Sequence, residues 1–306
     1  RWGVDFPQVR EARPDIIIMW QTGLGGRGPY HTYKSFGILV QHMSGVSMMS
    51  GLPGTPPVTI NSSYSDYHTG VFQPVGIIGA LMRRLLTGEP ATLESSIFSS
   101  GAVTSGPALL DYQVNGRIPE RIGNRDKHAV PHGAYPCLGE GRYCAIAVYT
   151  DQEWSAFCQA MGSPEWCREP EFATMLDRAA NEDKLDEHVG RWTAQLTSEE
   201  VMEKLQQAGV PASIVSQGHD LHDSPHLKAR EFYRPSKYYQ AERGILADQW
   251  KEGDSLSWTM PSRMSETPMG FGHYSNIGED NPYVFGELLG IPPDEIDRLT
   301  TEEVMF

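Results

Sequence analysis

The sequence predicts an α/β protein built from two lobes. Strand-like apolar runs alternate with segments of helical periodicity along the chain, and two such groups are separated by a stretch with neither pattern. A chain of 306 residues can bury one large core or two modest ones. The two groups therefore indicate two lobes, with a connection near residues 91–134.

The first group begins with a buried strand at residues 15–20. The elements that we expect after it are a glycine-dense loop at 23–28, a helix within 38–46, a proline-rich loop at 50–60 and a helix from about Thr69 to Leu86. Gly88 and Pro90 are typical of a helix end.

The second group begins near Pro131. We expect a hairpin with strands at 135–138 and 143–148, a helix at 154–161 introduced by Asp151, and two or three amphipathic helices within 171–207. Thr197 and Glu200 fit a capping box. A short strand at 212–215, strands and loops at 233–262, and helices at 281–299 complete the prediction.

Composition excludes several classes of function. A formal charge of −14 argues against a nucleic-acid-binding protein, because phosphates require basic surface. No apolar run approaches the ~18 residues of a membrane span. The four cysteines lack metal-site spacing, which indicates reduced thiols and a cytoplasmic protein. The start at Arg1-Trp2-Gly3, without a visible signal peptide, indicates a processed chain or a fragment.

The loop at residues 23–28 formally matches the G-x-G-x-x-G dinucleotide fingerprint. Pro29 and Tyr30 follow it, however, where a fingerprint would open a helix, and no acidic residue lies on a second strand about 20 residues on. A loop whose backbone amides approach a ligand is the better functional interpretation, and a plain tight connection is the structural alternative.

The stretch from Ser63 to Gly70 is the strongest candidate site. An aspartate such as Asp66 just ahead of a helix is most often an N-cap, but here a histidine, hydroxyl groups and a glycine crowd around it. His68 does not complete a Ser-His-Asp triad, because no nucleophile elbow is present. The cluster His219, His222 and His226 with nearby acids lacks a recognised metal-binding pattern, so we expect no metal site.

Taken together, these stretches resemble the family III CoA-transferases, which include formyl-CoA transferase and the carnitine and bile-acid CoA-transferases. The likeness follows the whole chain in order, through residues 13–15, 25–30, 40–45, 65–70, 131–137, 208–211, 224–230 and 288–290. The resemblance implies a Rossmann-like large domain at 1–115 that lacks its N-terminal part, a small domain with linkers at 116–262, and a C-terminal segment at 263–306 that returns to the large domain. It also implies an interlocked homodimer.

The resemblance further implies that Asp66 is the nucleophile of a CoA transfer from an acyl-CoA to a carboxylic acid. The aspartate would pass through a mixed anhydride and an aspartyl-CoA thioester. By the same resemblance, Lys34 lies near the CoA phosphates and Phe36 beside the pantetheine. The loop residues Gly25, Gly26 and Arg27 complete the expected CoA contacts, with coenzyme A bound as a substrate and no tightly bound cofactor.

Two alternatives follow from departures within the resemblance. Alpha-methylacyl-CoA racemases share the fold but carry a His-Asp step where this chain has Phe36-Gly37, and a phenylalanine cannot exchange a proton with an alpha carbon. A racemase-like isomerase is therefore disfavoured. The absence of the family's first strand-helix region, which serves the adenine end of CoA, leaves a non-catalytic subunit of a heteromeric transferase as the second alternative.

Overall fold

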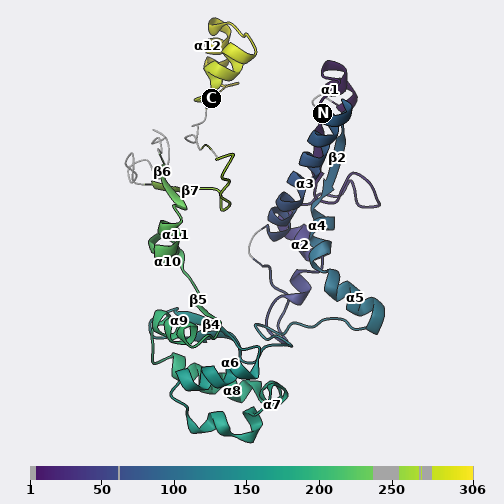
Figure 1. The fold of residues 1–306 in the computed structure, drawn as a ribbon. Coiled ribbons are helices and arrows are strands. Elements are labelled where there is room, and N and C mark those ends of the chain that lie inside the picture. The colour runs from purple at the N-terminus through teal and green to yellow at the C-terminus, as the bar shows by residue number, and fades with distance from the viewer. Residues whose placement is uncertain (1–4, 61–62, 237–254, 269, 271–277, 306) are drawn as a thin grey trace. The chain divides into compact units, whose positions relative to one another are not determined.

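The computed structural model describes residues 5–60, 63–236, 255–268, 270 and 278–305. The chain forms two compact units, Arg1–Val215 and Ser216–Phe306. Figure 1 shows the elements of both. The architecture is mixed α/β, as predicted. The predicted domain limits at residues 115 and 262 stay predictions.

The first unit opens with a parallel strand pair. After α1 (Phe6–Ala12), strand β1 (Ile18–Thr22) pairs with β2 (Thr92–Ser96), with Ile18 opposite Thr92 and Thr22 opposite Ser96. A parallel pair needs a long crossover, and here it contains α2 (Gly37–Met43), a 3-10 turn (Ser47–Met49) and α3 (Tyr64–Thr87). The carboxyl ends of both strands therefore meet at one edge, next to the glycine loop.

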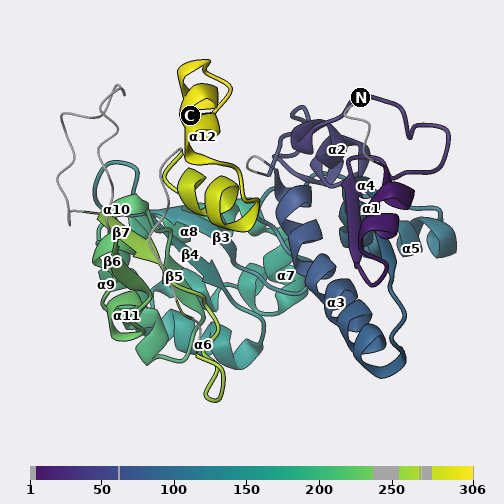
Figure 2. The ribbon, with the colours of Figure 1, turned by 90° about the horizontal axis from the view of Figure 1, so that it is seen from above.

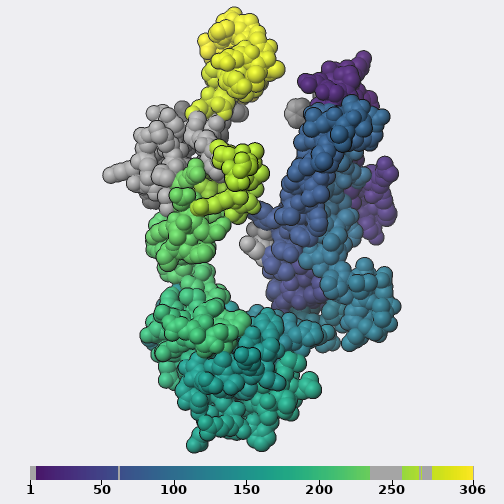
Figure 3. Space-filling model, viewed as in Figure 1, coloured from purple at the N-terminus to yellow at the C-terminus, as the bar shows by residue number. Residues whose placement is uncertain are grey.

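Helix α3 is longer than predicted. It starts at Tyr64, five residues before the expected start, and ends at Thr87, where the C-cap Gly88 has a φ of 74°. Gly70 and Pro74 lie inside the helix. Its first turns are held by the Thr69 hydroxyl, which donates to the Ser65 carbonyl at 2.7 Å. Helix α3, drawn in blue in Figure 3, carries exposed apolar side chains such as Val75 and Leu85.

The prediction of an irregular connection at 91–134 was wrong in its first half. This stretch contains β2, α4 (Ile97–Thr104) and α5 (Gly106–Asn115). The glycine and proline residues of this stretch weaken its periodicity, and for this reason the sequence indicated an irregular connection. Gly101 allows α4 to pack closely on Ser44 and Ser65, and Pro107 lies in the first turn of α5, where proline is tolerated.

The rest of the first unit is an antiparallel sheet covered by helices (Figure 2). Its strands, in the order β3 (His132–Pro136), β4 (Tyr143–Ala147) and β5 (Ala212–Ile214), confirm the hairpin and the short strand. The helices are α6 (Asp151–Ala160), α7 (Met175–Ala180), α8 (Glu182–Thr193) and α9 (Ser198–Gln207), with 3-10 turns at Glu165–Arg168 and Pro170–Phe172. The predicted capping box is present, since Thr197 and Glu200 exchange side-chain-to-amide bonds of 2.8 and 3.2 Å.

An arginine lies inside this part of the protein. Arg178 is fully buried and donates to the carbonyls of Val130 and Phe172 at 3.1 and 3.3 Å and to Asp151 at 3.2 Å. Its guanidinium also lies 4.7 Å from the ring centroid of Trp154. The charge is therefore fully hydrogen-bonded, as a buried cation must be.

The second unit contains short elements. They are α10 (Gly218–Asp223), α11 (Pro225–Ala229), the antiparallel strands β6 (Tyr233–Ser236) and β7 (Ser255–Trp258), a π-helix (Pro282–Leu288) and α12 (Pro293–Thr301). These elements confirm the helices expected at 281–299 and part of the strands expected at 233–262, of which 237–254 lie outside the described residues. Among the helices that are described, none has both the length and the apolar character to cross a membrane.

Candidate active site

Asp66 lies in the first turn of α3 and is not its N-cap. The N-cap is Ser63, which has a φ of 62°, and the Asp66 amide donates to the Ser63 carbonyl at 2.9 Å. The aspartate side chain is therefore free of the capping role that the sequence pattern alone would favour. A left-handed, non-glycine residue is uncommon and often marks a functional turn.

The carboxylate of Asp66 faces the backbone of Gly37 at the start of α2. A Cβ atom at position 37 would lie 3.0 Å from Cγ of Asp66 and 2.8 Å from Oγ of Ser63, and nearer still to Oδ2 of Asp66. Oδ2 itself is buried, and no hydrogen-bond donor reaches it from the described part of the chain. The described residues therefore leave the lone pairs of this oxygen without a hydrogen-bond donor.

Small residues bring the three helices around Asp66 together. Ser65 is fully buried beside Gly101 of α4, and a Cβ at position 101 would lie 2.8 Å from Oγ of Ser65 and 2.7 Å from Oγ of Ser44. Gln41 of α2 is also fully buried. This close packing fixes the backbone on which Asp66 is carried.

His68 points toward α4. Its Nδ1 lies 3.1 Å from the Ser100 carbonyl and 3.2 Å from Oγ1 of Thr104. A carbonyl can only accept, so Nδ1 carries the proton. The ring also stacks on Tyr64 at 5.9 Å and meets Phe72 edge-on at 4.9 Å. His68 is thus held between α3 and α4 by these contacts.

The glycine loop leaves β1 at the carboxyl edge of the parallel pair. Gly25 has a φ of 88°, and its neighbour Gly26 packs so closely on Trp20 that a Cβ there would collide with the indole. The amide of Gly26 donates to a carboxylate oxygen of Glu94, on β2. The sequence reasoning missed Glu94, because a single glutamate on an expected linker carries no signal.

The other expected contact residues precede α2. Lys34 and Arg27 are exposed, and Lys34 has no hydrogen-bond or ion-pair partner in the part of the chain that the structure describes. Phe36 is the N-cap residue of α2, is 64% exposed, and directly precedes Gly37. Phe36 is therefore the direct neighbour of Gly37, the residue that faces Asp66. For Lys34, the structure shows no contact with Asp66.

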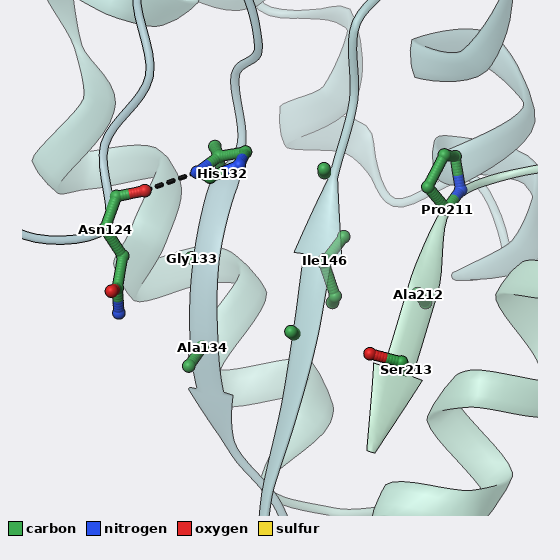
Figure 4. A pocket seen from close by; sticks show the side chains of 10 residues that line it. Asn124, His132, Gly133, Ala134, Ile146, Pro211, Ala212 and Ser213 are labelled. Carbon is green, nitrogen blue, oxygen red and sulfur yellow. Dashed lines mark hydrogen bonds between the residues drawn. The ribbon is translucent and has the colours of Figure 1, made fainter. Parts of the chain in front are cut away.

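A separate pocket of about 290 Å³ lies on the sheet β3–β4–β5 (Figure 4). Small side chains such as Ala134 and Ser213 line it, and its one titratable group, His132, is bonded through Nδ1 to the Asn124 carbonyl. It offers no carboxylate or thiol nucleophile. Across the described residues, no group of three or more histidine, cysteine, aspartate or glutamate side chains could hold a metal ion.

The model of CoA-transferase family III matches residues 1–269. The chain belongs to this family. A succinyl-CoA–D-citramalate CoA-transferase of Chloroflexus aurantiacus is 27% identical over 305 residues, which cover 99% of this chain and 73% of that protein. An acetyl-CoA:oxalate CoA-transferase of Acetobacter aceti is 29% identical over 231 residues, 75% of this chain and 59% of that protein.

The fold agrees with the family. A CAIB/BAIF family protein from Brucella suis superimposes with a TM-score of 0.81 at 23% identity, over 94% of this chain and 71% of that one. Family membership and these relatives make the chain a CoA-transferase with acyl-CoA substrates, as the sequence motifs predicted.

Proposed function

We propose that this chain moves coenzyme A from an acyl-CoA thioester to a carboxylic acid, with Asp66 as the nucleophile. The observation that carries the proposal is the buried Oδ2 of Asp66, which faces Gly37 and has no partner among the described residues. A carboxylate needs a free lone pair to attack a thioester, and this oxygen has one.

The proposed reaction steps account for every bond that forms and every bond that breaks. Asp66 attacks the thioester carbonyl, so the carbon–sulfur bond breaks and a mixed anhydride and CoA thiolate form. The thiolate then attacks the aspartyl carbonyl, which gives aspartyl-CoA and releases the donor acid. The acceptor carboxylate attacks the aspartyl-CoA thioester, which breaks its carbon–sulfur bond, forms a second mixed anhydride and expels CoA thiolate. The thiolate then attacks the acceptor's carbonyl carbon, which gives the product acyl-CoA and frees the Asp66 carboxylate. Each step exchanges groups of similar reactivity.

The CoA contacts belong to the same proposal. Lys34 is exposed and has an unpaired ammonium within the described chain, which suits a phosphate. Phe36 offers an exposed ring for the pantetheine arm, and Gly25, Gly26 and Arg27 offer a loop at the strand edge. The Glu94 carboxylate already accepts a hydrogen bond from the Gly26 amide. We therefore expect this amide to donate to CoA only if the Glu94 side chain moves away.

The space at position 37 argues against the racemase alternative. Those enzymes carry an aspartate there by resemblance, whereas here even a Cβ would collide with the Asp66 carboxylate. The interlocked homodimer and the location in a reducing compartment also stay proposals. The four free cysteines support the compartment, and light scattering of the purified chain tests the dimer.

The test is Asp66→Asn, assayed with succinyl-CoA or acetyl-CoA as donor and a panel of carboxylic acids that includes D-citramalate and oxalate, which appear in the relatives' names. We expect loss of CoA transfer with an unchanged melting temperature, and loss of the aspartyl hydroxamate that hydroxylamine forms in the unmodified chain. Retained turnover in the variant would refute the nucleophile. Absence of any adduct in the unmodified chain would favour the non-catalytic subunit, and alpha-proton exchange in deuterated water would favour the racemase.

A further inference from the structure

The second unit contains a pocket of about 240 Å³ that has no part in the CoA transfer proposed above. Two stretches far apart in the sequence line it, one within residues 230–234 and the other within 259–268. The antiparallel pair β6–β7 brings these stretches together, since Tyr233 lies opposite Trp258 (Figure 1). The pocket is therefore formed within one unit, by residues that the structure describes.

The lining of this pocket is basic. Arg230, Arg234 and Arg263 line it, and Glu231 is the one acidic residue among the described residues around it. The chain as a whole has a formal charge of −14 and so repels anions over most of its surface. A hollow with an excess of arginines is the place where such a chain can concentrate an anion.

Backbone carbonyls hold two of these arginines in place. A terminal nitrogen of Arg230 donates to the Pro261 carbonyl at 3.4 Å, and a terminal nitrogen of Arg263 donates to the Arg230 carbonyl. The amide of Thr259 donates to the Phe232 carbonyl at 2.8 Å. These bonds join the two stretches on either side of the pocket, so both guanidinium groups are kept at its wall.

The two guanidinium groups have donors to spare. An arginine side chain offers five N–H donors in a planar fork. In Arg230 and in Arg263 the bonds that the structure shows all start from one nitrogen, Nη2. Nε and Nη1 of both residues therefore have no acceptor in the described part of the chain. An oxyanion accepts two parallel bonds from such a fork.

Glu231 occupies part of this fork. One of its carboxylate oxygens accepts from Arg263 at 3.3 Å, and its side chain is 77% exposed. An ion pair that is exposed to water contributes little to stability, so the carboxylate can turn into solvent at a small cost. An anion that enters the pocket can then take its place on Arg263.

We propose that this pocket is a binding site for a small, doubly charged oxyanion, held by the guanidinium groups of Arg230 and Arg263 in place of Glu231. Inorganic phosphate and a short dicarboxylate share this chemistry, because both offer several oxygens and a charge of two to the arginine forks. The volume of about 240 Å³ is below the roughly 300–1,000 Å³ of sites for drug-sized ligands, so the ligand is small.

The test is isothermal titration calorimetry of the full chain in a buffer without phosphate. One arm uses inorganic phosphate and the other uses succinate, which separates the two sources of the oxyanion. We expect saturable binding in at least one arm, and we expect it to weaken as salt is added. Heats of dilution alone in both arms would overturn the proposal.

Variants locate the site. Arg230→Gln and Arg263→Gln should each weaken binding by about tenfold, because each removes a charged donor. Glu231→Gln should tighten it roughly twofold or more, because it removes the competing carboxylate. The control is Arg298→Gln, in α12 of the same unit, where the arginine pairs with Glu295 and Glu302. This control should bind as the unmodified chain does, and an equal loss in it would contradict the assignment.

Two further variants separate this site from the site of CoA transfer. If Lys34→Gln or Asp66→Asn abolishes the binding, the anion occupies the transfer site and the proposal is wrong. Should Arg230→Gln fail to fold, Glu231→Gln decides the question, since weaker or unchanged binding in that variant would overturn the exchange of anion for carboxylate. CoA transfer by the unmodified chain is measured independently of these outcomes.

Discussion

Replacing Gly37 by alanine should reduce CoA transfer while leaving the protein folded. The added Cβ would lie 2.8 Å from Oγ of Ser63 and 3.0 Å from Cγ of Asp66, and nearer still to Oδ2, whereas ordinary van der Waals contact begins at 3.4 Å. The methyl group is fixed to the backbone of residue 37. The carboxylate must therefore move by about 1 Å to relieve this overlap.

A displacement of about 1 Å at a reacting atom can cost roughly 10²-fold in rate. We therefore expect the kcat of Gly37→Ala to fall by about two orders of magnitude, with a smaller change in the KM for the acyl-CoA, because the CoA contacts proposed above do not involve the added methyl group. Steady-state kinetics and hydroxylamine trapping of the aspartyl intermediate measure both effects.

Gly79→Ala is the matched control. Gly79 lies on α3, the helix that carries Asp66, and a Cβ there meets nothing within 4 Å. This variant should keep full activity and gain up to about 1 kcal/mol in the free energy of unfolding, because alanine is the better helix former. Unchanged kcat in Gly37→Ala would refute the steric reasoning, and so would an equal loss of activity in the control.

Two further predictions concern the helical core of the first unit. In a denaturant titration, Arg178→Ala should lower the free energy of unfolding by about 3 kcal/mol, because it leaves two buried carbonyls without a donor. The control is Arg191→Ala. The Arg191 side chain is 67% exposed, so its loss should lower the free energy of unfolding by no more than about 0.5 kcal/mol. Burial raises the pKa of Asp186 even though the Tyr135 hydroxyl donates to it at 2.6 Å, so the folded state holds this proton to a higher pH than the unfolded state. The unmodified protein should therefore lose stability relative to Asp186→Asn as pH rises from about 3.8 through the raised pKa, and level off above it; a difference in melting temperature that is constant across this pH range would refute the assignment.

The sequence predicted well where local signals and packing agree. The antiparallel hairpin at residues 132–147 and the capping box at Thr197 follow from turn residues and from side chains three positions apart, and both are present. The family and the CoA-transferase activity were predicted by the order of many modest motifs, and the family comparison confirms them.

The failures have a common physical cause. Helix α3 begins at Tyr64 and not at Thr69, and its N-cap Ser63 has a left-handed conformation that no preference of serine predicts. The helix α4 was missed because Gly101 weakens a helical pattern, although its lack of a side chain is what lets Ser44 and Ser65 approach. In both places tertiary packing around Asp66 overrides local propensity, as is expected where structure serves a site.

The same packing leaves one carboxylate oxygen of the proposed nucleophile without a hydrogen-bond donor among the described residues. A nucleophilic aspartate that accepts several hydrogen bonds is stable but has its lone pairs occupied. Asp66 lies in the first turn of a 24-residue helix, whose dipole stabilises a negative charge there by about 0.3–1 kcal/mol without using a lone pair of Oδ2. Gly37, which has no side chain, leaves the room that this carboxylate occupies, so the helix start supplies the field and the glycine permits the position of the oxygen.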